Sequence, residues 1–168
     1  MKTMHVQTHV ASFVIATLLL LQISPALADG PPAAEADKFH GRVEVTFLKW
    51  IPDFSGSMAG VVSGDVGGGT FVGETLSVNQ TGAIATIEAL YHINGKALQF
   101  TAHNYVTFDT QKGTAVIKGF VTDGLLKGAR VNGEFQAISP CGIINALAGA
   151  FGDECFQGNL VIRPGSKD

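Results

Sequence analysis

From Gly41 to Arg163 the chain is a succession of short segments in which apolar and polar residues alternate, separated by glycine-rich turns. Alternation with a period of two is the pattern of a β-strand with one buried face. A chain of short antiparallel strands hides its edges by closing into a barrel or by stacking two sheets. This pattern therefore predicts an all-β fold.

The first 28 residues have the organisation of a secretion signal. Lys2 precedes a 12-residue apolar run, Val10–Leu21, and Ala26-Leu27-Ala28 is an A-x-A cleavage site. The run is shorter than the roughly 20 apolar residues of a membrane-spanning helix. We expect a signal peptide over 1–28, a disordered leader over 29–39 and a β-barrel domain over 40–165. The protein would then be secreted or periplasmic, with no transmembrane segment after cleavage.

Eight strands are expected between turns that contain Gly, Asn-Gly or Asp-Gly. Eight strands joined by short turns favour a single eight-stranded antiparallel β-barrel, with a two-sheet sandwich as the alternative. Glycines within strands favour the barrel, because glycine relieves crowding where a small barrel bends: Gly73, Gly119, Gly133 and Gly158. The expected strands are Arg42–Lys49, Met58–Ser63, Thr70–Val78, Ala83–Ile93, Lys96–Asp109, Thr114–Thr122, Ala129–Ile138 and Phe156–Arg163.

The dipeptide Asn94-Gly95 is typical of a two-residue type I′ turn and predicts a hairpin between the fourth and fifth strands. A two-residue loop fixes the register, and a slip by one residue would exchange the two faces. The expected pairs on the apolar face are Ile93–Lys96, Tyr91–Leu98, Ala89–Phe100 and Ile87–Ala102, and those on the polar face include Glu88–Thr101 and Thr86–His103.

Cys141 and Cys155 are the two cysteines of the chain. In an oxidising compartment they are expected to pair, closing a loop of 15 residues. A redox or metal pair is the alternative, but their spacing is not C-x-x-C. Between them, Ile143–Phe151 has the spacing of apolar residues that predicts one short helix between the last two strands.

Two glycine-paced segments carry a resemblance to a known family: GDVGGGTFVGE at Gly64–Glu74 and GFVTDGLLKGARVNGEF at Gly119–Phe135. They resemble hairpins of the allene oxide cyclase-like barrels, most closely the mostly uncharacterised bacterial members. The resemblance implies a calycin-type eight-stranded barrel whose apolar lumen holds a lipid-like or polyketide-like ligand. The catalytic positions of the plant cyclase have no residue-by-residue match here, so the resemblance does not carry over cyclase activity.

Three classes of function follow. The first is binding of a hydrophobic small molecule, with no demonstrated catalysis, in a lumen lined by Phe47, Ile87, Tyr91, Phe100, Phe135 and Phe156. The second is a cyclase or isomerase that uses Glu88, His103 and Tyr105, which share the polar face of the central hairpin. That face is equally typical of an ordinary solvated exterior. The third is a structural or interaction barrel that acts as an oligomer through the apolar residues Ile84, Leu90 and Val161, although single apolar residues are normal on monomers.

Charge and motifs exclude other classes. Removal of the predicted signal peptide takes Lys2 away and leaves 10 basic and 14 acidic residues. This negative net charge argues against a nucleic-acid partner. The run GDVGGGT lacks the Lys-Ser/Thr ending of a phosphate-binding P-loop. His40, His92 and His103 lack the spacing of zinc ligands. The sequence therefore indicates no metal site and no cofactor, and it leaves the oligomeric state open.

Overall fold

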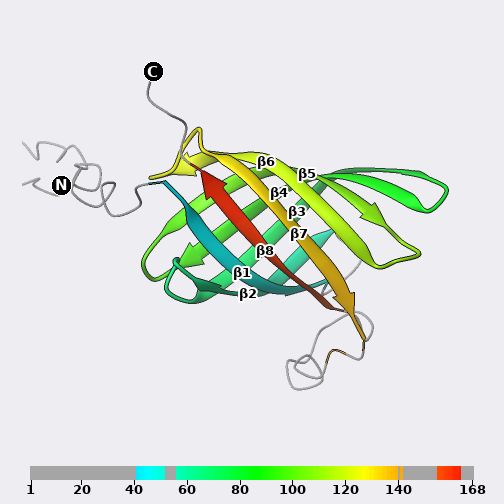
Figure 1. The fold of residues 1–168 in the computed structure, drawn as a ribbon, viewed down its shortest axis with the longest axis horizontal. Helices are drawn as coiled ribbons and strands as arrows, with labels where there is room; N and C mark the ends of the chain where they lie inside the picture. Colours follow the sequence, from blue (N-terminus) through cyan, green and yellow to red (C-terminus); the bar gives the residue numbers. More distant parts are fainter. Residues whose placement is uncertain (1–40, 52–55, 140, 142–154, 164–168) are drawn as a thin grey trace, which may run out of the picture. The chain divides into compact units, whose positions relative to one another are not determined.

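The fold is a closed antiparallel barrel of eight strands, seen in a computed structural model that describes residues 41–51, 56–139, 141 and 155–163 (Figure 1). Each strand pairs with its neighbours in sequence, and β8 pairs with β1, so the described part contains a closed sheet and no helix. The strands are β1 (Val43–Trp50), β2 (Ser57–Gly64), β3 (Gly69–Thr81), β4 (Ile84–Gly95), β5 (Gln99–Asp109), β6 (Thr114–Gly124), β7 (Arg130–Ile138) and β8 (Cys155–Arg163).

The all-β class and the eight-stranded antiparallel barrel are thus confirmed, and the sandwich is excluded. The predicted signal peptide over 1–28, the leader over 29–39 and the helix over Ile143–Phe151 lie outside the described residues.

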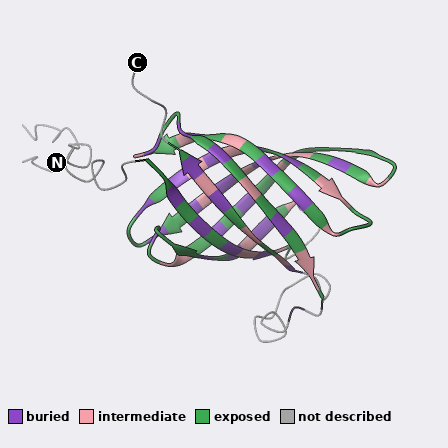
Figure 2. Cartoon of the chain, in the orientation of Figure 1, coloured by how far each residue is buried: buried purple, intermediate pink, exposed green. Residues whose placement is uncertain are grey.

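Alternation along each strand decides which side chains enter the barrel. Val43, Val45 and Phe47 are buried on β1, whereas Glu44 and Thr46 between them are exposed. The same alternation runs around the barrel, so buried and exposed residues follow one another along the strands (Figure 2). Because a barrel has no free edge, every strand gains backbone hydrogen bonds on both sides while its apolar face fills the interior.

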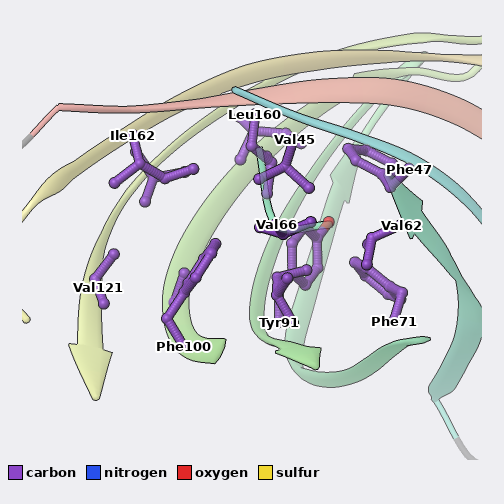
Figure 3. Close-up of a cluster of buried hydrophobic side chains, with 14 of the residues drawn as sticks. Val45, Phe47, Val62, Val66, Phe71, Tyr91, Phe100, Val121, Leu160 and Ile162 are labelled. Atoms are coloured by element: carbon purple, nitrogen blue, oxygen red, sulfur yellow. The ribbon is translucent and has the colours of Figure 1, made fainter. Parts of the chain in front are cut away.

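The interior is packed with aliphatic and aromatic side chains (Figure 3). Phe47 and Phe71 stack with ring centroids 5.7 Å apart, and Tyr91 meets Phe71 edge-on at 4.9 Å. Aromatic pairs in these geometries contribute about 0.5–1.5 kcal/mol each beyond the area that they bury. The lumen is therefore largely a solid core and not a channel.

One end of the barrel is closed by loops. Val66, in the β2–β3 loop, is fully buried, and Leu98 and Leu126 from the next two loops at that end are buried with it. The backbone N–H of Ala97 donates to the Val66 carbonyl over 2.9 Å, and that of Lys96 donates to the Gly68 carbonyl over 3.0 Å. We call this the closed end. The opposite end, where β1 finishes and β2 begins, is called the cavity end.

The predicted register of the β4–β5 hairpin is wrong. Asn94 pairs with Gln99 and the Gly95 N–H donates to the Leu98 carbonyl, so Lys96 and Ala97 form the turn in place of Asn94-Gly95. The physical reason is the docked β2–β3 loop, which accepts hydrogen bonds from both turn residues. Gly95 is needed for close packing there, since a Cβ atom would lie 2.6 Å from that of Val66.

The register moves by four residues, an even number, so both faces keep their predicted sides. The structure pairs Ile93 with Phe100, Tyr91 with Ala102, Ala89 with Asn104, Ile87 with Val106, Glu88 with Tyr105 and Thr86 with Thr107.

Gly158 makes room for an aromatic ring in the core, and this gives a testable expectation. A Cβ atom on it would lie 2.7 Å from the Phe47 ring and 2.6 Å from the Phe135 Cβ, and it would collide with the Glu134 carbonyl. Gly158→Ala should therefore lower the free energy of unfolding by roughly 1–3 kcal/mol, as overpacking does in other cores. Urea denaturation measures the change. The neighbouring outward substitution Asn159→Ala is the control, expected within about 0.5 kcal/mol of wild type; equal effects of the two would contradict this packing.

Candidate functional site: a lysine in the barrel lumen

A lysine points into the apolar lumen near the cavity end. Lys49 is the last inward-facing residue of β1, in line with Val43, Val45 and Phe47, and only 3% of its surface is exposed. Lysine is among the residue types that are almost never fully buried without a partner. Its position therefore needs an explanation other than packing.

The contacts of the Lys49 ammonium are with one hydroxyl, one sulfur and a set of aromatic rings. The Nζ atom donates a hydrogen bond to the Tyr91 hydroxyl over 2.7 Å and lies 3.6 Å from the Met58 Sδ. A cation near aromatic ring faces is attracted to them, most strongly where water is excluded. The distances from Nζ to the ring centroids are 4.3 Å for Phe135, 4.6 Å for Tyr91, 5.6 Å for Phe47, 5.8 Å for Phe71 and 6.0 Å for Phe156.

Burial shifts the proton equilibria of both polar groups. Removal from water disfavours the ammonium and lowers the pKa of Lys49 from 10.5 to about 7. The same cause raises the pKa of Tyr91, which stays a neutral hydroxyl. Within the described residues, no carboxylate is found in an ion pair with Lys49. The aromatic rings offset only part of the cost of a buried ammonium, and the described part of the chain provides no counter-ion for its positive charge.

A cavity of about 130 Å³ lies beside Lys49. Its walls are mostly apolar, and Lys49, Tyr91 and Thr75 provide the polar side chains. Ile51 and Gly56, where β1 ends and β2 is about to begin, place the cavity at the cavity end of the barrel. The other lining residues are Met58, Ile87, Val106, Phe108, Phe135 and Phe156.

The predicted lumen residues divide between this cavity and the solid core. Ile87, Tyr91, Phe135 and Phe156 line the cavity, and the Phe47 ring lies beneath the Lys49 ammonium. Phe100 faces the lumen as well, but it pairs with Ile93 and Gly124 toward the closed end and does not line the cavity.

The predicted catalytic candidates lie together on the outside of the barrel. His103 Nε2 and Glu88 Oε1 are 2.7 Å apart, and the His103 ring lies 5.1 Å from the Tyr105 ring. Glu88 faces Tyr105 across the strands and not Thr101 as predicted, yet it still reaches His103 diagonally. The Glu88 side chain is 35% exposed and that of His103 19%. The three line neither the lumen cavity nor the larger outer hollow.

That outer hollow has a volume of about 740 Å³ and crosses the outward faces of β4 to β8 and β1. Its side chains are those of a polar barrel exterior, such as Thr107, Glu134, Gln136 and Asn159. This broad surface depression is more open than the lumen cavity, and a larger share of its lining is polar, whereas small-molecule sites are typically enclosed and mostly apolar. The smaller lumen cavity is the better candidate.

The remaining predicted residues lie elsewhere. Cys141 and Cys155 are buried at disulfide-bonding distance, with Cα atoms 5.5 Å apart, against Leu48, Trp50 and Ile138 on the outer side of the barrel wall. Ile84 and Leu90 face outward on β4, whereas Val161 is on β8, which is not adjacent to β4. These three apolar residues therefore do not form one patch.

Comparisons with protein-family models, with curated proteins and with solved structures found no match to this chain. In the part of the chain that the structure describes, no three His, Cys, Asp or Glu side chains gather closely enough to hold a metal ion. The same residues include no helix long and apolar enough to cross a membrane.

Sequence reasoning missed Lys49, although a signal was present. Inward positions on β1 follow Val43, Val45 and Phe47, and the next position in that series is Lys49. A lysine at a strand end normally extends its ammonium into water, so the alternation alone did not distinguish a solvated end from a buried charge.

Proposed function

We propose that this protein is an exported β-barrel that binds a hydrophobic small molecule at the cavity end of its lumen. The observation that carries the proposal is the cavity of about 130 Å³, walled mostly by apolar side chains around the hydrogen-bonded pair Lys49 and Tyr91, with Thr75 as a further polar residue. Ligand sites are typically concave and apolar with a few polar groups that fix orientation. The predicted likeness to allene oxide cyclase-like barrels fits this proposal and stays a prediction.

Export is part of the proposal. It is supported by the signal pattern over 1–28 and by the Cys141–Cys155 pair, whose distance suits a disulfide. Disulfides persist in oxidising compartments and are rare in reducing ones.

Titration with 1-hexanol, a short apolar probe, tests the binding proposal. In ¹H–¹³C NMR spectra, hexanol should shift the signals of Ile87, Val106 and Phe135, which line the cavity, and leave the closed end unchanged. Ile87→Trp fills the cavity and should abolish the shifts. Val116→Trp adds the same bulk to an outward position and is the control. The proposal would be overturned if hexanol caused no saturable shifts in wild type. It would also be overturned if Ile87→Trp showed the same shifts as wild type.

A cyclase or isomerase at Glu88, His103 and Tyr105 remains a second candidate, because the hydrogen bond between Glu88 and His103 is the kind of contact that acid–base chemistry uses. Its weakness is the exterior position, where nothing encloses a substrate. Glu88→Gln would separate the candidates, since it should leave hexanol binding intact and abolish any turnover at this pair.

A further inference from the structure

We propose that the ligand of the lumen site is a hydrophobic carboxylic acid, bound as its carboxylate by Lys49 and Tyr91 together. This inference rests on the proposed binding function and names the chemical class of its ligand. Hydrogen-bond donors, charge and the size of the cavity all favour this class of ligand.

The donors of the two polar groups are only partly used. An ammonium has three N–H donors, and within the described chain Lys49 directs them to the Tyr91 hydroxyl and to the weak acceptor Met58 Sδ. Tyr91 accepts from Lys49, so its own O–H proton is available to another acceptor. Two donor groups 2.7 Å apart, both bordering the cavity, match the two oxygens of one carboxylate.

Charge favours an anion over a neutral ligand. A buried ammonium without a counter-ion is strongly unfavourable, and the described residues that line the cavity include no acidic side chain. A carboxylate supplies one negative charge for one positive charge. A phosphate or sulfate ester would bring further oxygens into walls that are mostly apolar, where the Thr75 hydroxyl is the one further side-chain donor among the described lining residues. A neutral alcohol or ketone would leave the ammonium unpaired.

Size limits the part of the ligand held inside. A dry apolar cavity of about 150 Å³ accommodates benzene in another protein, and this cavity measures about 130 Å³. It therefore suits a carboxylate with roughly six carbons. A longer hydrocarbon chain would have to continue past Ile51, which is exposed at the cavity end.

The test compares hexanoate with 1-hexanol, which has the same chain and no charge, at pH 7 by calorimetry or NMR. Wild type should bind hexanoate at least about tenfold more tightly than hexanol, because hydrogen bonds to charged groups are stronger than neutral ones. Lys49→Met keeps the length and apolar body of the side chain; it should lose this preference and bind hexanol at least as well as wild type. Tyr91→Phe keeps the ring and should reduce the preference. Lys118→Met, which removes an outward lysine from β6, is the control and should behave as wild type.

The outcomes separate the inference from the function on which it rests. If hexanol and hexanoate bind equally to wild type and to Lys49→Met, the carboxylate inference fails and the binding function stands. If neither probe binds wild type, the binding function fails. If the preference for hexanoate survives in Lys49→Met, the anion binds elsewhere and the inference also fails.

Discussion

Lys49→Met should stabilise the ligand-free barrel at pH 7 by several kcal/mol. The pKa of Lys49 falls from 10.5 to about 7 in the folded protein because burial disfavours its charge. A fall of this size corresponds to a free-energy cost on the order of 4 kcal/mol at pH 7, since each tenfold change in an equilibrium constant is about 1.4 kcal/mol. Methionine fills a similar volume and has no charge to bury, so the cost disappears in the variant.

The same substitution should remove a pH dependence. Between pH 7 and about 9.5 the unfolded chain keeps a proton on Lys49 that the folded chain has released, so the unfolded state binds more protons and stability rises with pH. We expect a rise of roughly 3 kcal/mol over this window in wild type. The window ends below pH 10 because tyrosine in the unfolded chain ionises above that pH, whereas the raised pKa of Tyr91 keeps it protonated in the folded protein. Tyr91 would then make stability fall with rising pH, opposite to the effect of Lys49.

Urea denaturation of wild type and Lys49→Met at several pH values in this window measures both effects. Lys118→Met changes the same residue type at an exposed position and should keep the wild-type slope. Strong destabilisation by Lys49→Met would contradict the account, because it would show that Lys49 already has a counter-ion within the chain.

Loss of the disulfide should cost roughly 3 kcal/mol. Cys141 and Cys155 are 14 positions apart, and a cross-link closing about 15 residues restricts the unfolded chain by that amount in the chain-entropy model. The cysteines also pack against Leu48 and Trp50 of β1 and Ile138 of β7, so they contribute to the side-chain packing between β1, β7 and β8. Substitution of both cysteines by alanine should therefore lower the free energy of unfolding and leave the barrel folded.

Trp50 is the single tryptophan and reports on this region directly. Its fluorescence should follow urea unfolding, with a lower midpoint in Cys141→Ala/Cys155→Ala and in wild type with reductant. The double variant should be insensitive to reductant, which is the internal control. Two reactive thiols in unfolded, unreduced protein isolated from an oxidising compartment would show that the bond does not form.

Much of the fold could be predicted from the sequence, because closure of an all-β chain depends on local alternation. Val43, Val45 and Phe47 identify the inner face of β1 without knowledge of any partner strand. The inward glycines were predictable for the same reason, and Gly158 shows their purpose by admitting the Phe47 ring.

What could not be predicted depends on contacts between distant segments. The β4–β5 turn moves to Lys96 and Ala97 because the β2–β3 loop binds their N–H groups, an interaction invisible in the hairpin's own sequence. Asn104 is fully buried opposite Ala89. Alternation along β5 places it inward, but its amide side chain gives no sequence signal of burial.

The candidate site was only half predictable. Ile87, Tyr91, Phe135 and Phe156 were identified as lumen residues from alternation, and three strands, β4, β7 and β8, bring them around one cavity. Lys49 escaped because its burial depends on the rings contributed by those other strands. A charged residue at the end of an alternating series was the available sequence signal, but alternation alone does not distinguish it from a lysine whose ammonium extends into water.

The central claim is that Lys49 forms a carboxylate site in the lumen, and titration of Lys49 itself tests it most directly. The titration is followed by NMR of the ¹³Cε–¹Hε signals of Lys49 with and without hexanoate. Lys49→Met assigns the signal by its absence. In the free protein the pKa should lie at about 7, and saturating hexanoate should raise it, because a bound carboxylate favours the ammonium. A pKa near the ordinary 10.5 in the free protein, or one that hexanoate leaves unchanged, would contradict a lumen site built around an unpaired lysine.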